Sequence, residues 1–468
     1  MSKLRRKPDT GAGTGVVFLL LVLAIILITV IVKVASHQGP TVVLSKPAKG
    51  LGQRTEIVME AKDEKHNLKL VSVEVVQAGQ VVHQANLALS TRPHRWWKFW
   101  SRGPASTANW TVPVGREVIP GLKEGRATVH ITALNDSWGR FFRGGRGELT
   151  LDLPVRFAPP QVEVLTTQHY INQGGCDMVV FKVSPGTTES GVQVGDSYFP
   201  SFPVSDSHPE TRLCLFAYAH NVDPSTTARI VARDDAGNQS LASFTYRVFP
   251  KKFHSDTIDL DKIQNGKFLD NVVPPIMTQT PELHDEGSLI KNFLEINGAL
   301  RKTDAAKLVA LSQHTAPRFL WKGSFLRLPS KTEAGFADYR TYIYGGQAVD
   351  HQTHLGFDLA GSEHMPVRAA NSGVIVFAGF LGIYGNAMVI DHGCGLQSLY
   401  GHLSSIGVKE GDQVKGEQEI GRSGQTGLAA GDHLHFTMLL DGIPVNPVEW
   451  WDPHWIHDRI DAKLKEYQ

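Results

Sequence analysis

Histidine and aspartate recur in three short segments between residues 354 and 435, and this pattern constrains the fold more than any other feature. The segments read His-Leu-Gly-Phe-Asp from His354, Tyr-Gly-His-Leu around His402 and His-Leu-His-Phe from His433. Imidazole nitrogen and carboxylate oxygen are donors that zinc accepts, and a catalytic zinc keeps one position open. His433 and His435 are two residues apart, so on a strand they share a face, where one can bind metal and the other can contact substrate.

In this order the segments resemble the lysostaphin-type (LytM-type) zinc endopeptidases, which cut peptides of peptidoglycan. The resemblance covers about the last third of the chain, roughly from Trp321 to Trp451. Gly385-Asn386 ahead of a Val-Ile-Asp-His strand and the glycine-rich stretch 421–427 also fit the family. It implies a zinc-dependent metalloendopeptidase that hydrolyses amide bonds in peptidoglycan peptides, with Zn²⁺ as its cofactor.

The family's site residues can be placed on this chain one by one. The resemblance implies three zinc ligands, which are His354, Asp358 and His435. It implies two catalytic histidines, which are His402 and His433, without saying which of them is the general base. The remaining histidines of this region are expected to be ordinary surface or core residues, namely His351, His364, His392 and His454.

Two other classes of function remain open. Some family members lose ligands and act as non-catalytic activators or scaffolds for other cell-wall hydrolases, but this chain keeps all five positions, which favours catalysis. The chain could also serve as a binding module anchored to the wall. No His-Glu-x-x-His and no Gly-x-Ser-x-Gly occur, so a helical zinc protease and a serine hydrolase are not indicated.

Bulk properties exclude further classes. The 468 residues suffice for several domains, and a net charge of +1 gives no case for nucleic-acid binding. With three cysteines the chain is neither a disulfide scaffold nor a multi-cysteine zinc protein. Cys176 and Cys214 could pair if the region is exported, or remain two buried thiols.

An apolar segment near the amino terminus predicts a membrane anchor. Residues 1–15 are basic, and the apolar run 16–32, flanked by Lys33, predicts a single transmembrane signal anchor at 16–34. Because the basic flank precedes the run, the amino terminus is expected in the cytoplasm of a bacterium and the peptidase outside the cytoplasmic membrane. A cleaved signal peptide is the alternative, and it would also export the rest.

The predicted fold is mainly β. After the anchor we expect a β-sandwich spacer at 40–158, an immunoglobulin-like β-sandwich at 160–250 and a helical connector at 251–320. An antiparallel-sheet peptidase domain with a lipoyl-like hairpin follows at 321–452, and a short amphipathic helix at 453–468 ends the chain. The basic and aromatic stretch 92–102 is expected to pack on its own sandwich, with a membrane or glycan contact as the alternative.

The connector carries three helical patterns. They predict helices at 259–270, at 286–300 and from Thr303 onward, with Pro274-Pro275 breaking the chain between the first two. The helices are expected to pack on the catalytic domain. The alternative is an inhibitory segment that covers the active site.

Overall fold

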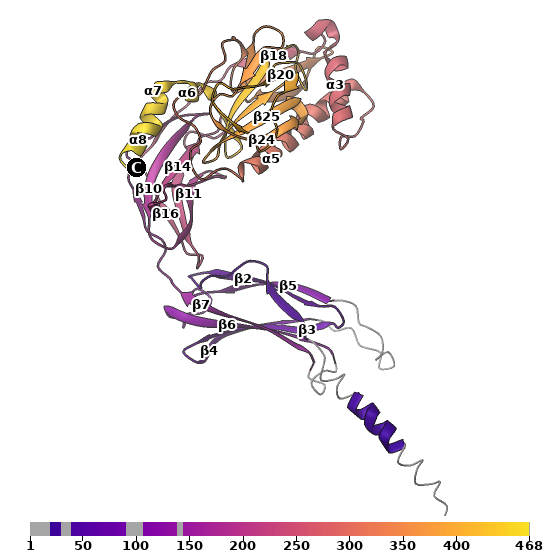
Figure 1. Cartoon of the computed structure of the whole chain (residues 1–468), viewed down its shortest axis with the longest axis vertical. Helices are drawn as coiled ribbons and strands as arrows, with labels where there is room; N and C mark the ends of the chain where they lie inside the picture. The colour runs from indigo at the N-terminus through magenta and orange to yellow at the C-terminus, as the bar shows by residue number, and fades with distance from the viewer. Residues whose placement is uncertain (1–18, 30–38, 90–105, 138–143, 468) are drawn as a thin grey trace, which may run out of the picture. The chain divides into compact units, whose positions relative to one another are not determined.

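A computed structural model describes residues 19–29, 39–89, 106–137 and 144–467, and the protein is mainly β. The chain forms two compact units (Figure 1). One comprises residues 1–159 with Asp234–Asn238, and the other comprises 160–233 with 239–468. The predicted basic segment 1–15 and the basic and aromatic stretch 92–102 lie outside the described residues.

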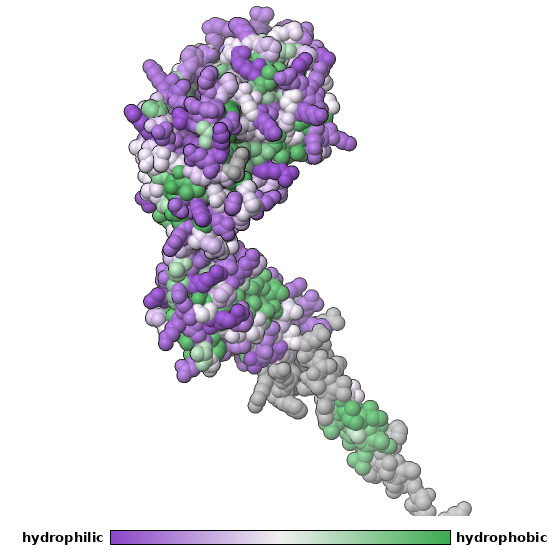
Figure 2. Space-filling model, turned by 60° about the vertical axis from the view of Figure 1, so that its left-hand side comes forward, coloured by the Kyte–Doolittle hydropathy of each residue, from purple (hydrophilic) through white to green (hydrophobic). Residues whose placement is uncertain are grey.

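Only the central part of the predicted anchor is described. Residues 19–29 are helical, and their large apolar side chains are exposed (Figure 2). The hydroxyl of Thr29 donates to the carbonyl of Ile25 at 2.7 Å, so this polar group is satisfied within the helix. Within the described ranges, no helix has both the length and the apolar character needed to span a membrane.

The first unit is a two-sheet β-sandwich. One sheet has the order β1-β2-β5, made of Thr41–Leu44, Thr55–Asp63 and Ser106–Val114. The other has the order β4-β3-β6-β7, made of Gln80–Ala88, Leu68–Gln77, Gly125–Asn135 and Arg146–Val155. Alternate residues of β2 and β6 are buried, as period-two patterning requires of strands with one face on a core.

A second β-sandwich begins the other unit. One sheet has the order β13-β14-β10-β8, made of Phe202–Ser205, His208–Ala217, Cys176–Val183 and Val162–Val164. The facing sheet has the order β12-β11-β15-β16, made of Ser197–Pro200, Thr187–Val194, Ala228–Asp234 and Gln239–Ala242. A parallel pair, β9 (Tyr170–Asn172) and β17 (Arg247–Phe249), flanks them. In the antiparallel pairing of β10 with β14, Cys214 lies opposite Val179, and Cys176 and Cys214 are both buried free thiols.

The connector departs from its predicted helices. The helix predicted at 259–270 does not form as such: Asp259 ends strand β18 (Ser255–Asp259), and a 3-10 turn, η2 (Ile263–Gly266), follows. Helix α3 (Phe268–Gln279) then contains Pro274 and Pro275, so the predicted break there is wrong. Burial of Val272, Val273 and Ile276 in the connector's core accounts for a helix that proline would otherwise disfavour.

The later helices are joined into one. Helix α4 (Leu289–Glu295), the π-helical η3 (Ile296–Leu300) and α5 (Arg301–Ser312) follow one another without interruption. The predicted helix start at Thr303 is therefore wrong. Thr303 lies inside the helix, where its hydroxyl donates to the carbonyl of Ala299 at 3.2 Å instead of capping a new terminus.

The predicted peptidase region, residues 321–452, is built on a large antiparallel sheet. Its order is β19-β22-β30-β26-β25-β24-β28, with β31 on β30: Lys331–Ala334, Phe357–Ala360, Leu434–Leu440, Leu396–Gly401, Asn386–Gly393, Gly373–Phe380, Gln413–Val414 and Ile443–Val445. Two three-stranded sheets adjoin it. One is β18-β20-β21 (Ser255–Asp259, Asp338–Tyr344, Gln347–His354) and the other is β23-β29-β27 (Pro366–Arg368, Glu419–Arg422, Ser405–Ile406).

Short helices close the chain and attach the second sandwich. They are α6 (Pro447–Trp451), α7 (Pro453–Ile456), the π-helical η5 (His457–Asp461) and α8 (Ala462–Lys465). Ile460 and Leu464 are buried, as their helical spacing predicts. One hydrophobic core runs from the second sandwich into the peptidase region. Lys463 of α8 also binds the fully buried Asp177 of β10 at 2.6 Å.

Candidate metal centre

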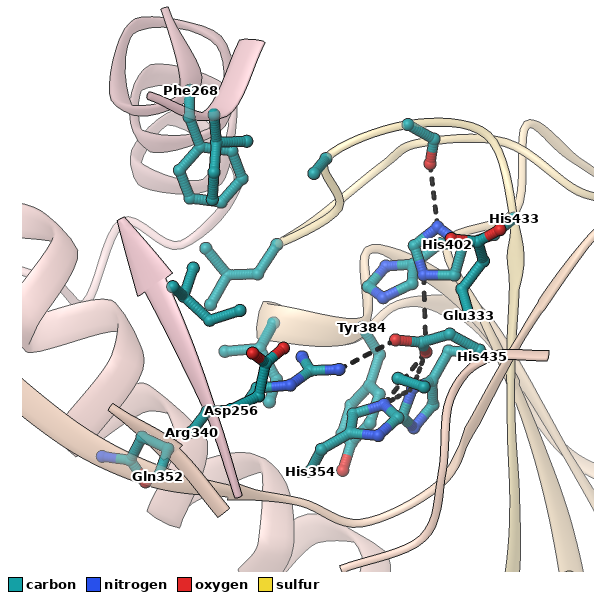
Figure 3. A pocket seen from close by; sticks show the side chains of 18 of the residues that line it. Asp256, Phe268, Glu333, Arg340, Gln352, His354, Tyr384, His402, His433 and His435 are labelled. Carbon is teal, nitrogen blue, oxygen red and sulfur yellow. Dashed lines mark hydrogen bonds and ion pairs between the residues drawn. The ribbon is translucent and has the colours of Figure 1, made fainter. Parts of the chain in front are cut away.

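Strand register brings the three predicted metal ligands together. Asp358 on β22 is paired with His435 on β30, and His354 ends β21. The Nε2 atom of His354 and the Nδ1 atom of His435 each lie 3.0 Å from Oδ1 of Asp358, and 3.1 Å from one another. All three side chains are buried, and the three candidate ligand atoms lie within 4.8 Å of one another. Figure 3 shows two of these ligands, His354 and His435, side by side.

Hydrogen bonds on the far side of each ring fix its tautomer. Nδ1 of His354 lies 2.9 Å from the carbonyl oxygen of Gly335 and must donate to it. The hydroxyl of Thr437 donates to the carbonyl of Leu355 at 2.9 Å, so it accepts from Nε2 of His435, also at 2.9 Å. The nitrogens that face Asp358 therefore carry lone pairs, as metal-binding imidazoles do.

Three acceptors facing one another at this distance need a positive charge between them. The carboxylate and two unprotonated nitrogens repel one another unless a cation or a proton lies among them. Two imidazoles and one carboxylate suit zinc and leave a fourth position free. The residues present therefore fit a catalytic zinc.

Gly356 explains why the first segment reads His-x-Gly. A Cβ atom at this position would lie 2.5 Å from both Nε2 of His435 and the hydroxyl of Thr437. Only glycine leaves room for the hydrogen bond that orients the third ligand.

The other two histidines of the motifs face the same place. Nδ1 of His402 donates to the carbonyl of Thr426 at 2.7 Å, and Nδ1 of His433 donates to the carbonyl of Gly431 at 2.8 Å. Nε2 of His433 then lies 3.4 Å from Oδ1 of Asp358. The rings of His402 and His433 are 4.8 Å apart, and Figure 3 shows both near His354 and His435.

Burial and charge set the protonation of the site. Burial would raise the pKa of Asp358, but without a metal the protonated forms of His354, His433 and His435, through the charge of His354 and hydrogen bonds from all three, hold it well below its usual range. Burial also lowers the pKa of His402 far below its ordinary value, helped by His433 and His435. Burial lowers the pKa of His433 as well, but its bond to Asp358 outweighs this and raises it.

Several residues around the centre were not predicted from the sequence. Arg340 on β20 donates to Oδ2 of Asp358 at 3.1 Å, and the ring of Tyr384 packs 5.3 Å from that of His435. Tyr384 also accepts the backbone N–H of His402 at 2.7 Å through its carbonyl. Thr437 could have been found, because it follows His435 by two residues on one strand and so shares its face. No sequence pattern marks Arg340 or Tyr384.

The centre lies in a cleft of about 550 Å³. The peptidase strands line it together with connector residues, among them Phe268, Phe293 and Arg301. Of the four histidines expected to be ordinary, none lines this cleft. His392 is buried elsewhere, between the carbonyl of Ser372 and the hydroxyl of Ser398.

Comparisons with known proteins agree with this geometry. Residues 352–447 match Peptidase family M23. The chain is 47% identical over 95 residues to the DD-carboxypeptidase/endopeptidase Mpg of Neisseria meningitidis, which covers 20% of this chain and 22% of that protein. It is 28% identical over 194 residues to the stage II sporulation protein Q of Bacillus subtilis, covering 41% of this chain and 54% of that protein.

A solved structure resembles the same region. The catalytic domain of lysostaphin from Staphylococcus simulans is 33% identical, with a TM-score of 0.22. The match covers 25% of this chain and 90% of that structure. This chain thus spans about a fifth of the length of the Neisseria relative. The lysostaphin match covers about a quarter of this chain.

Proposed function

We propose, on the premise that the chain belongs to Peptidase family M23 through residues 352–447, that it is a zinc-dependent metalloendopeptidase acting on amide bonds of peptidoglycan peptides. The observation that carries this proposal is the convergence of His354, Asp358 and His435, whose unprotonated metal-ligating atoms face one another. The substrate class is supported by the name of the Neisseria relative, a DD-carboxypeptidase/endopeptidase.

His354, Asp358 and His435 would hold the metal. When bound, zinc supplies Lewis acidity that brings the pKa of water toward neutrality. Arg340 binds the second oxygen of Asp358, so the carboxylate presents Oδ1 to the site in a fixed orientation.

His402 and His433 would move the protons. Each donates Nδ1–H to a backbone carbonyl, so each can present the lone pair of Nε2 to the reacting groups. An imidazole placed in this way can take a proton from water and return it to the leaving amine. The other imidazole, once protonated, can donate to the oxygen of the scissile carbonyl as negative charge develops there.

A second candidate is a non-catalytic activator or scaffold of cell-wall hydrolases. It is favoured by the match to the stage II sporulation protein Q, whose name carries no enzymatic activity. The five histidine and aspartate side chains in one cleft favour catalysis over this candidate.

We also propose that residues 16–34 anchor the protein in the cytoplasmic membrane of a bacterium and that the peptidase lies outside it. The apolar run and its basic flank support this proposal. If it is correct, alkaline carbonate will leave the protein in the membrane fraction, and protease added to spheroplasts will degrade the peptidase region.

The activity can be tested with the full-length protein and purified peptidoglycan. Treatment with a chelator should abolish release of peptide fragments, and added zinc should restore it. Mass spectrometry of the fragments will identify the new amino and carboxyl ends, and a His435→Ala variant should release none. Undiminished cleavage by the chelated protein or by that variant would contradict the proposal, and zinc binding without cleavage would favour the activator.

A further inference from the structure

The helical connector forms one wall of the metal-bearing cleft. Its core contains Phe268, Phe293 and Leu300 together with Ile383 of the peptidase region. In Figure 3, Phe268 extends from its helix toward the space in front of the histidines. Connector side chains are therefore placed to contact whatever binds at the metal centre.

Helix α5 is fixed to the turn beside the metal centre. Asp304 is fully buried, and its Oδ2 accepts the backbone N–H of Ile383 at 2.9 Å in the turn η4 (Gly382–Tyr384). A side chain at Gly382 would overlap with this carboxylate. Because Tyr384 of the same turn contacts both His402 and His435, α5 has a defined position relative to the site.

Arg301 lies one turn before Asp304 on the same side of α5 and lines the cleft. Arg301 shares this cleft with Tyr384 and with the histidines of the motifs. Tyr384 in turn packs on the metal ligand His435. A cation from the connector thus lines the same cleft as the metal centre.

Hydrogen bonds to Asn297 orient the guanidinium of Arg301 but do not neutralise its positive charge. Its Nε donates to the carbonyl of Asn297 at 3.2 Å, and Nη2 donates to the side-chain oxygen of Asn297 at 2.6 Å. Asn297 is itself fully buried and donates to Asp350 at 2.7 Å. Of the five N–H donors of an arginine, most remain available.

Among the described residues, no carboxylate lies within ion-pair distance of Arg301. The other guanidinium of the cleft, Arg340, is paired with Asp358 at 3.1 Å. Three other acids of the lining do not pair with Arg301 either: Glu333 binds Lys331 at 2.8 Å, Asp432 accepts from Ser423, and Asp256 is exposed. Among the described cations of this cleft, Arg301 is therefore the one that forms no ion pair, and its charge acts on the buried carboxylate of Asp304 only through space.

We propose that Arg301 binds a carboxylate of the peptide substrate and so selects peptides that carry a free carboxyl group near the scissile amide. This inference rests on the proposed function, because it takes the cleft to hold a peptide of peptidoglycan, a polymer whose stem peptides are rich in free carboxyl groups. A guanidinium with parallel free donors matches a carboxylate in a bidentate fashion.

The test compares two substrates and four forms of the full-length protein. The substrates are a purified cross-linked muropeptide with free carboxyl groups and the same muropeptide after amidation of those groups. The proteins are the wild type, Arg301→Gln, Arg301→Lys and the control Lys302→Gln, whose side chain is exposed on the same helix. KM and kcat are measured for each pair, together with equilibrium binding of both muropeptides by calorimetry.

Arg301→Gln should raise KM for the free acid about tenfold to a hundredfold with little change in kcat, because it removes a charge-assisted contact. Arg301→Lys should retain part of the affinity, and Lys302→Gln should match the wild type. With the amidated muropeptide, the wild type and Arg301→Gln should not differ.

Two results would overturn the inference. One is an equal loss on both muropeptides, since a misplaced helix would produce that. The other is a wild type that binds the free acid and the amide with equal affinity. If the wild type binds the free acid more tightly but cleaves neither muropeptide, the proposed function fails while the inference about Arg301 stands.

Discussion

Arg340 contacts the oxygen of Asp358 that the imidazoles leave free, at 3.1 Å. Replacing it with methionine keeps most of the side-chain volume but releases the carboxylate. Partners of this kind typically contribute about tenfold to a hundredfold in metal affinity. We therefore expect Arg340→Met to weaken zinc binding by that factor in a competition titration with a chelating dye. The exposed Arg318→Met serves as the control, and unchanged zinc affinity in Arg340→Met would contradict the assigned contact.

A variant at His402 can test catalysis separately from metal binding. It does not belong to the group that can hold the metal, and its Nδ1 donates to Thr426. The variant His402→Gln should keep zinc at wild-type stoichiometry while kcat falls about a hundredfold to ten-thousandfold, the usual contribution of a positioned acid or base. Metal content and turnover are measured on the same preparation. Loss of zinc from this variant would instead make His402 a ligand.

For individual residues, the sequence was informative where histidine and aspartate side chains occur in short motifs. The five motif residues lie in one cleft, in which Asp358 and His435 are directly paired on the neighbouring strands β22 and β30. Arg340 and Tyr384 could not be predicted, because an arginine in a strand or a tyrosine in a glycine-rich turn has many structural uses. Their roles depend on contacts between segments far apart in the chain.

Among the elements, the connector was predicted least well. Local rules made Pro274-Pro275 a break and Thr303 a helix start, yet tertiary burial keeps α3 helical and joins α4, η3 and α5. The strands of the sandwiches were predicted better, because alternation is visible within a few residues. The contact of α5 with the turn η4 is a tertiary feature that no local pattern contains.

That contact leads to a prediction about Gly382. It has a φ of +39°, and a Cβ there would overlap with the carboxylate of Asp304. Gly382→Ala should lower the free energy of unfolding by about 1–3 kcal/mol, typical of overpacking and backbone strain. It should also lower kcat, since the turn contacts His402 and His435. In an Asp304→Ala background the same change should cost less, because the overlap is gone.

Chemical denaturation of the wild type, Gly382→Ala, Asp304→Ala and the double variant gives the interaction free energy between the two positions. The control is Gly298→Ala, because a Cβ at Gly298 meets no atom within 4 Å. Additive effects of Gly382→Ala and Asp304→Ala would show that the two positions do not interact.

For the whole molecule, the second sandwich and the peptidase region form one body. Glu449 of α6 is buried and accepts from the backbone N–H of Cys176 at 2.8 Å and from the side chain of Asn172 at 3.0 Å. A side chain at Gly175 would overlap with this carboxylate. The sequence predicted a spacer at this place. It did not reveal the contact with α6, because that contact joins residues more than 270 positions apart in the chain.

Glu449 also makes stability depend on pH. Burial raises its pKa to about 7 from an ordinary value of 4.5. Between these values the folded protein keeps the proton and the unfolded chain has lost it, so stability falls as pH rises through this window, by about 3 kcal/mol in total. Glu449→Gln cannot titrate, so the difference in unfolding free energy between variant and wild type should change by that amount between pH 4.5 and 7.5. A constant difference across this range would contradict the shifted pKa.

The buried contact of Glu449 with Asn172 and Cys176 also bears on transplanting the catalytic region into other proteins. A graft that starts at Trp321 leaves behind the strand that satisfies this carboxylate and the aspartate that binds Lys463. It would therefore expose an apolar seam and leave an acid and a base without partners. The transplantable unit therefore begins near Pro160, and chimeras cut at that point should remain soluble where shorter ones aggregate.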